Sequence, residues 1–169
     1  MTRELHCYEY VNHSYDSVRT ALLADPIALF QRATAAAVNR ANTVAANLSV
    51  SVGALEIGTG ISIVVTAVET DTHAVLRVPL TRIKLEWRAS QSASLFPSMV
   101  AELDVYPLSS AETQLVLAGE YRAPGGAIGA AADAVLLHRV AEASVHKLLR
   151  QLSERLRLEL DESTPGQGR

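Results

Sequence analysis

Apolar and polar side chains alternate with a period of two through much of the chain, and this pattern predicts β-strands. Residues 4–12 alternate, and the alternation resumes at Leu48. The other alternating segments are 48–52, 61–68, 73–78, 82–90, 99–105 and 115–121. Neighbouring side chains of a strand point to opposite faces of a sheet, so each segment offers one face to a core and the other to solvent. The pattern predicts a sheet of about six to seven strands.

A period of three to four residues replaces the alternation in two places and predicts helices. After the first strand, Ser14 or Asp16 can cap a short helix, and Pro26 suits the first position of a second one. The other helical region is near the C-terminus, where one much longer helix is expected over residues 127–160. Its apolar stripe consists of Ala134, Leu137, Ala141, Val145, Leu148, Leu149, Leu152 and Leu156.

The order of these elements predicts an α+β fold in one domain over residues 1–160. Consecutive strands joined by short turns pair antiparallel, and a sheet with helices segregated from it forms two layers. The last helix is the element with enough apolar area to cover the sheet. We therefore expect a curved antiparallel sheet wrapped around this helix, followed by a disordered tail at 161–169.

Composition narrows the class of protein. Hydrophobic residues make up 49% of the 169 residues, which is typical of a globular domain, and a formal charge of -3 argues against nucleic-acid binding. A single cysteine, Cys7, excludes an internal disulfide and suits a reducing compartment. No targeting segment and no membrane-spanning run is visible, so a cytoplasmic protein without membrane insertion is expected.

The scarcity of large side chains favours a cavity between the sheet and the last helix. Aromatic residues are only 5% of the chain, and Ala134 and Ala141 are small members of the helical stripe. Small side chains facing a curved sheet leave a void, and a void lined by apolar groups accepts apolar ligands. The alternative is a flatter sheet that packs tightly onto the helix.

Several side chains are candidates for lining this cavity. His138 lies within the helical stripe and could donate a hydrogen bond, although a histidine at the edge of a core is the simpler interpretation. Tyr121 and Trp87 combine a large ring with a polar tip. Arg77 could bind a carboxylate if it points inward. The remaining candidates are apolar positions of the strands and the helix: Met99, Leu103, Leu117, Ala134, Ala141 and Val145.

The sequence does not determine which face of the first strand points inward. If it is the face of Cys7, then Glu9 is a buried carboxylate; if it is the face of Tyr8 and Tyr10, Glu9 is solvated. No catalytic set, cofactor motif or metal-ligand spacing is apparent, and the glycines at 125–129 lack the spacing of a nucleotide-binding loop.

Local strings of the sequence resemble the START and birch-pollen-allergen superfamily, also called SRPBCC or polyketide-cyclase-like. They are Val78-Pro79-Leu80 with Trp87, Leu95-Phe96-Pro97, Gly119 to Pro124, Gly125 to Gly129 with Asp133, and Leu137 to Glu142. The resemblance covers roughly residues 4–158 and is closest to an uncharacterised bacterial branch. It implies the helix-grip fold with a cavity between the sheet and the final helix.

Three functions remain open from the sequence. The first is a non-catalytic module that binds a small hydrophobic molecule such as a lipid or a polyketide. The second is an enzyme of the cyclase or dehydratase kind, in which His138, Tyr121 or Arg77 would move protons. The third is an interaction protein or homodimer that uses Leu136 and Val140 of the long helix.

Overall fold

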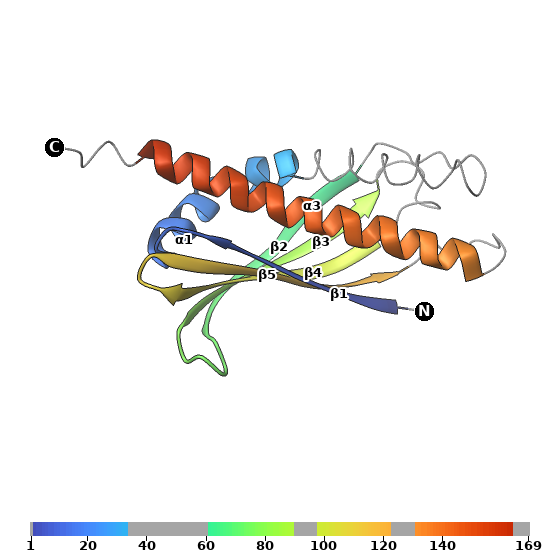
Figure 1. Cartoon of the computed structure of the whole chain (residues 1–169), viewed down its shortest axis with the longest axis horizontal. Coiled ribbons are helices and arrows are strands. Elements are labelled where there is room, and N and C mark those ends of the chain that lie inside the picture. Colours follow the sequence, from blue (N-terminus) through green and yellow to red (C-terminus); the bar gives the residue numbers. More distant parts are fainter. Residues whose placement is uncertain (1, 34–60, 90–97, 123–130, 164–169) are drawn as a thin grey trace.

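We describe the protein from a computed structural model. It covers the backbone of residues 2–33, 61–89, 98–122 and 131–163, and the side chains within these ranges except at 2–3, 61–62, 88–89, 98, 121–122 and 131–141. The described elements are β1 (Thr2–Val11), α1 (Tyr15–Ala24), helical residues 26–33, β2 (Ile61–Thr72), β3 (Pro79–Ala89), β4 (Ser98–Ser109), β5 (Glu112–Arg122) and α3 (Ala131–Ser163). This order confirms the α+β class (Figure 1).

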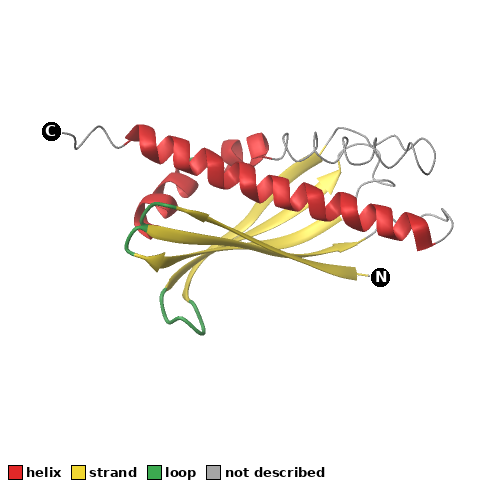
Figure 2. Ribbon diagram, in the orientation of Figure 1, coloured by secondary structure: helices red, strands yellow, loops and turns green. Residues whose placement is uncertain are grey.

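The strands form one antiparallel sheet in the order β1-β5-β4-β3-β2. β2 to β5 each pair with the next strand along the chain, and β5 also pairs with the first strand, β1, along its whole length. The helix α3 lies on one side of this sheet (Figure 2). The described part of the chain thus has five strands rather than six to seven. The strand expected at 48–52 lies outside the described residues.

The two short helices after β1 are confirmed, and local hydrogen bonds explain where they begin. The Ser14 side chain accepts a hydrogen bond from the Ser17 backbone N–H at 3.4 Å and caps α1. Asp25 does the same for the next helix, since its Oδ1 accepts from the backbone N–H of Ala28 at 3.0 Å. Both helices bury apolar side chains against the sheet: Val18, Leu22, Leu29 and Phe30.

The strand predicted at 73–78 is wrong, because these residues form the turn between β2 and β3. The backbone N–H of His73 donates to Val78 at 2.8 Å, and that of Arg77 donates to His73 at 2.9 Å. Arg77 has a φ of 56°, a left-handed conformation that interrupts a strand. The apolar residues that suggested a strand are exposed, Val75 by 83% and Leu76 by 48%.

Several element ends extend beyond the predicted segments. β2 continues to Thr72, which pairs with Pro79, and Pro79 begins β3 at a position where a proline is tolerated. β4 continues to Ser109 past an irregularity at Pro107. α3 extends to Ser163, three residues into the predicted tail, whose remainder lies outside the described residues.

The sheet has an apolar concave face, and on β1 this is the face of Cys7. Leu5, Cys7 and Val11 are buried, whereas Tyr8 is 60% exposed on the opposite face. The concave positions align in rows across the strands. One row joins Cys7, Leu117, Leu103, Ile83 and Val68, and the adjacent row joins Leu5, Gly119, Ala101, Leu85 and Val65.

α3 covers this face and runs alongside β1 in the same direction (Figure 1). The Arg157 guanidinium donates to the backbone carbonyl of Tyr10, and His13 lies 3.0 Å from the Asp161 carboxylate. These contacts place the C-terminal end of α3 at the C-terminal end of β1. Its buried side chains form the other wall of the core: Ser144, Val145, Leu148, Leu149, Leu152, Ser153, Leu156 and Leu160.

β4 and β5 approach each other closely at Gly119. A Cβ at this position would lie 2.8 Å from the Cβ of Ala101 and 2.9 Å from the carbonyl oxygen of Val100. Bending a sheet toward its concave side brings the inward-pointing side chains of paired strands together, and glycine is the residue that permits this. The backbones of β4 and β5 therefore approach more closely here than two side chains would allow.

We expect Gly119→Ala to destabilise the protein by about 1 to 3 kcal/mol, the range for overpacking a well-packed site. Denaturant unfolding followed by circular dichroism measures this free energy. The matched control is Ala118→Ser on the exposed face of the same strand, which should change stability by less than about 0.5 kcal/mol. Adding Ala101→Gly to Gly119→Ala should restore part of the loss. An unchanged unfolding midpoint for Gly119→Ala would show that the close approach does not constrain the sheet.

Candidate functional site

Among the described side chains, one end of the concave face combines apolar groups with one polar tip, the indole N–H of Trp87. Ile63, Trp87, Met99 and Tyr121 occupy one row of the sheet, in neighbouring strands. Trp87 is 4% exposed and Met99 is 6% exposed, and Ile63 packs against the core. The adjacent row contains the small residues Ala101 and Gly119. We refer to the described members of these rows, Ile63, Val65, Leu85, Trp87, Met99, Ala101 and Gly119, as the Trp87 wall.

The alignment of α3 with β1 shows which part of the helix lies at this level. Arg157 meets Tyr10, and Tyr121, in the row of Trp87, pairs with Arg3. Seven strand residues from Tyr10 back to Arg3 span about 23 Å at a rise of ~3.3 Å. The same distance corresponds to about 15 helical residues at ~1.5 Å each. The helical backbone at this end is therefore near residue 141.

This placement brings the predicted residues of two elements to the same end of the bowl. Ala134, His138 and Ala141 belong to the N-terminal part of α3, and Tyr121 lies at the end of β5. Their side chains lie outside the described residues. The other candidates, Val145, Leu103 and Leu117, are buried in the core by 96% or more. Their role in lining a cavity stays a prediction.

Arg77 does not lie in the bowl, which corrects the expectation that it could bind a ligand there. It belongs to the β2–β3 turn and is exposed. The ring of His73 in the same turn packs against that of Tyr106, with centroids 4.5 Å apart and the ring planes tilted by 53°. Tyr106 follows Val105 and occupies the opposite face of β4. The turn therefore folds toward the outer face of the sheet, away from α3 (Figure 2).

The polar tip of Trp87 has no partner among the described residues. Its Nε1 is buried and forms no hydrogen bond. A buried N–H without an acceptor costs about 1 to 3 kcal/mol, and most native structures satisfy such groups. This feature distinguishes Trp87 from its neighbours in the wall, which have no polar side-chain atoms to satisfy.

Glu9 lies on the concave face, half-buried, in the row that continues to Leu115, Val105 and Thr81. Glu9 lies two residues after Cys7 along β1, on the same face of the strand. Burial of the Cys7 side chain raises the pKa of its thiol to about 12, and the negative charge of Glu9 acts in the same direction. The thiol therefore stays protonated at neutral pH, which makes Cys7 a packing residue rather than a nucleophile.

We expect native Cys7 to be unreactive toward Ellman's reagent at pH 8 and to react within minutes in denaturant. The pKa of 9.0 in an unfolded chain lies below the folded value of about 12. The thiol thus stays protonated to a higher pH in the folded state than in the unfolded state. The free energy of unfolding therefore falls as the pH rises from 9 to 12. A Cys7→Val variant should lose this share of the pH dependence. Rapid labelling of the folded protein would contradict the burial of the thiol.

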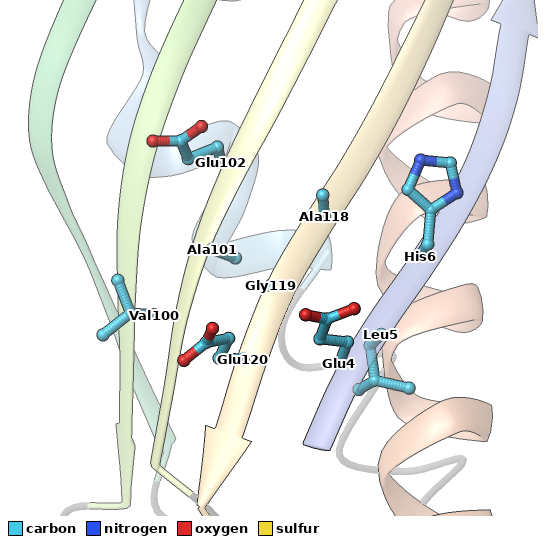
Figure 3. Close-up of a pocket in the computed structure, with 9 residues that line it drawn as sticks. All are labelled: Glu4, Leu5, His6, Val100, Ala101, Glu102, Ala118, Gly119 and Glu120. Atoms are coloured by element: carbon cyan, nitrogen blue, oxygen red, sulfur yellow. The ribbon is translucent and has the colours of Figure 1, made fainter. Parts of the chain in front are cut away.

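A separate hollow of about 410 Å³ lies on the outer face of the sheet, and Figure 3 shows it. It is open, with carboxylates of Glu4 and Glu120 side by side in paired strands. Gly119 lies at its floor with Leu5 and Ala101, whose side chains are buried on the other face. The other lining residues are Glu4, His6, Val100, Glu102, Ala118 and Glu120. Three carboxylates therefore give this open hollow an acidic character.

Charged residues of the outer face pair across the strands, as the alternation predicts. Arg82 donates two hydrogen bonds of 2.7 Å to Asp104 and lies 3.3 Å from Glu102. Lys84 donates to Glu69 at 2.7 Å. The bond to Asp104 raises the pKa of Arg82, and the bond to Glu69 raises that of Lys84. Within the described ranges, no cluster of three or more histidine, cysteine or acidic residues could hold a metal ion.

Comparison with solved structures identifies the fold. The Zhui aromatase/cyclase from Streptomyces sp. R1128 aligns over 100% of both chains with a TM-score of 0.50 and 17% identity. The chain shares the α+β fold of this aromatase/cyclase, an antiparallel sheet with a long C-terminal helix on one face. Looser matches include norcoclaurine synthase from Thalictrum flavum (TM-score 0.45, 13% identity, 94% of this chain and 88% of that one). A START superfamily protein from Mycobacterium smegmatis matches with a TM-score of 0.41 and 9% identity, over 95% of this chain and 99% of that one.

The fold is therefore shared at low sequence identity. No family model matches the sequence, and no curated protein matches it.

None of the helices in the part that the structure describes has the length and apolar character needed to cross a membrane.

Sequence reasoning missed two features of this helix-grip bowl. The first is the packing of Gly119, because a lone glycine in a strand does not reveal which side chain it meets across the pair. The register Ala101 opposite Gly119, two small residues on facing strands, is the signal that could have found it. The second is the unsatisfied N–H of Trp87, which depends on tertiary contacts.

Proposed function

We propose that the protein binds one small apolar molecule between the Trp87 wall and the N-terminal part of α3. The observation that carries the proposal is the composition of the wall, where aliphatic and small side chains surround one indole. Ligand sites of small molecules are concave, largely apolar and supplied with few polar groups. The described residues of the Trp87 wall are apolar apart from one indole N–H, which supports the proposal.

The sequence of α3 favours the Trp87 end of the concave face, rather than the opposite end, as the place for a ligand. From Val145 onward, its buried stripe consists mostly of leucines, which fill the space above Cys7 and Leu115. Toward the N-terminus the stripe contains Ala134, Leu137 and Ala141, two of which are small. An alanine is several methylene groups smaller than a leucine, so the same helix at the same distance occupies less volume near Trp87. We propose that a ligand uses this volume.

The likeness to an aromatase/cyclase is compatible with this proposal but does not define the ligand. At 17% identity it concerns the fold. A cyclase-type reaction would require polar groups that converge on one point. Arg77 is excluded by its place in an outer turn, so His138 and Tyr121 would have to supply them. Binding without turnover needs no such convergence and is the simpler function.

We expect N-phenyl-1-naphthylamine, a neutral fluorescent probe, to bind with a stoichiometry of one and to accept energy from Trp87. This residue is the only tryptophan, so energy transfer reports directly on the proposed end of the bowl. Met99→Gln should weaken the affinity about tenfold or more, because it places an amide in an apolar wall. A fluorescence titration measures both effects.

The control is Val100→Gln, the next residue of β4, which is 63% exposed on the outer face beside the acidic hollow. It should leave the affinity unchanged. Equal losses for the two variants, or a loss only for Val100→Gln, would place the probe on the outer face and contradict the proposal. Circular dichroism shows whether Met99→Gln remains folded, and Met99→Leu should retain binding.

A further inference from the structure

We infer that the ligand carries a hydrogen-bond acceptor, a carbonyl or ether oxygen, that accepts the N–H of Trp87. The inference rests on the proposed function, since it specifies which apolar molecules the same site prefers. It adds a polar requirement that the composition of the wall alone does not give.

The first step concerns the state of the indole. Trp87 is 96% buried, and its Nε1 donates to no acceptor within the described part of the chain. Buried indole N–H groups usually find a partner. Thr81, the other buried polar residue of β3, has one, because its hydroxyl lies 2.7 Å from the hydroxyl of Tyr15. The same strand therefore satisfies one buried polar group and leaves the other free.

The second step concerns what could satisfy it. The neighbours of Trp87 in its row, Ile63 and Met99, and the residue of the adjacent row, Leu85, offer no oxygen or nitrogen in their side chains. An acceptor on a bound molecule would form the missing bond. Because the N–H is already removed from water, its desolvation cost is present before binding, and the bond contributes more than one formed from a solvated donor.

The third step concerns charge. An indole N–H is a neutral donor, and no cation is among the described residues of the Trp87 wall. A carboxylate would lose its hydration without gaining a counter-ion. A neutral ketone, ester, quinone or ether is therefore the class that fits, with the rest of the molecule apolar.

The experiment compares 2-acetylnaphthalene with 2-isopropenylnaphthalene, which has the same shape but a CH₂ in place of the carbonyl oxygen. Each is used to displace N-phenyl-1-naphthylamine from the wild type and from Trp87→Phe, with the probe excited directly. The quantity of interest is the ratio of the two dissociation constants. We expect this ratio to shift about tenfold toward the hydrocarbon in Trp87→Phe, since one buried hydrogen bond is lost.

Two controls separate the hydrogen bond from the shape of the ring. Val100→Gln on the outer face should leave the ratio as in the wild type. Replacing the single tryptophan by β-(3-benzothienyl)alanine puts sulfur where indole has its N–H and preserves the two fused rings, so it should reproduce the shifted ratio even if Trp87→Phe fails to fold.

The outcomes distinguish the two proposals. An unchanged ratio in both variants, or a failure of the ketone to displace a probe that does bind, overturns the acceptor requirement and leaves apolar binding intact. If the probe itself does not bind to the wild type, the proposed function fails, and the acceptor requirement fails with it.

Discussion

The contact between α3 and the concave face of the sheet is the interaction on which the rest of the structure depends. Each layer has one apolar surface, and neither could stay in water with it exposed. Five leucines of α3 are buried in the core with residues of β1, α1 and the rows around Cys7: Leu148, Leu149, Leu152, Leu156 and Leu160. Contacts at the C-terminal ends of β1 and α3, Arg157 with Tyr10 and Asp161 with His13, set how far the helix lies along the sheet.

This alignment has a consequence for the opposite end. At Gly119 and Ala101, small side chains allow β4 and β5 to approach closely. The fully buried large side chains belong mainly to the rows of Cys7 and Glu9 and to the helices that cover them. The Trp87 wall, at the other end of the concave face, contains the small residues Ala101 and Gly119. The proposed ligand site is at this end for that reason.

Alternation and helical periodicity were sufficient to predict the class of fold, the two short helices, the long helix and the inner faces of β3, β4 and β5. Residues such as Ile83, Leu103 and Leu117 are buried as their spacing indicates. The pattern failed at 73–78, because Val75 and Leu76 are apolar but exposed in a turn that local hydrogen bonds close. It left β1 ambiguous, since one face carries Glu9 beside Cys7 and the other carries two tyrosines, and only packing against α3 selects Cys7 over Tyr8. The direction of the Arg77 side chain and the missing hydrogen-bond partner of the Trp87 N–H depend on distant parts of the chain. Periodicity does not report such contacts.

The most direct test of an apolar site at the Trp87 end is the indole ¹H–¹⁵N cross-peak of Trp87, which is a single signal because the chain has one tryptophan. Titration with 2-acetylnaphthalene should move this cross-peak downfield and saturate at one ligand per protein, as the N–H acquires an acceptor. A cross-peak that stays in place while other signals shift would locate the ligand elsewhere, and a cross-peak that stays in place with no other change would show that this end of the bowl is closed.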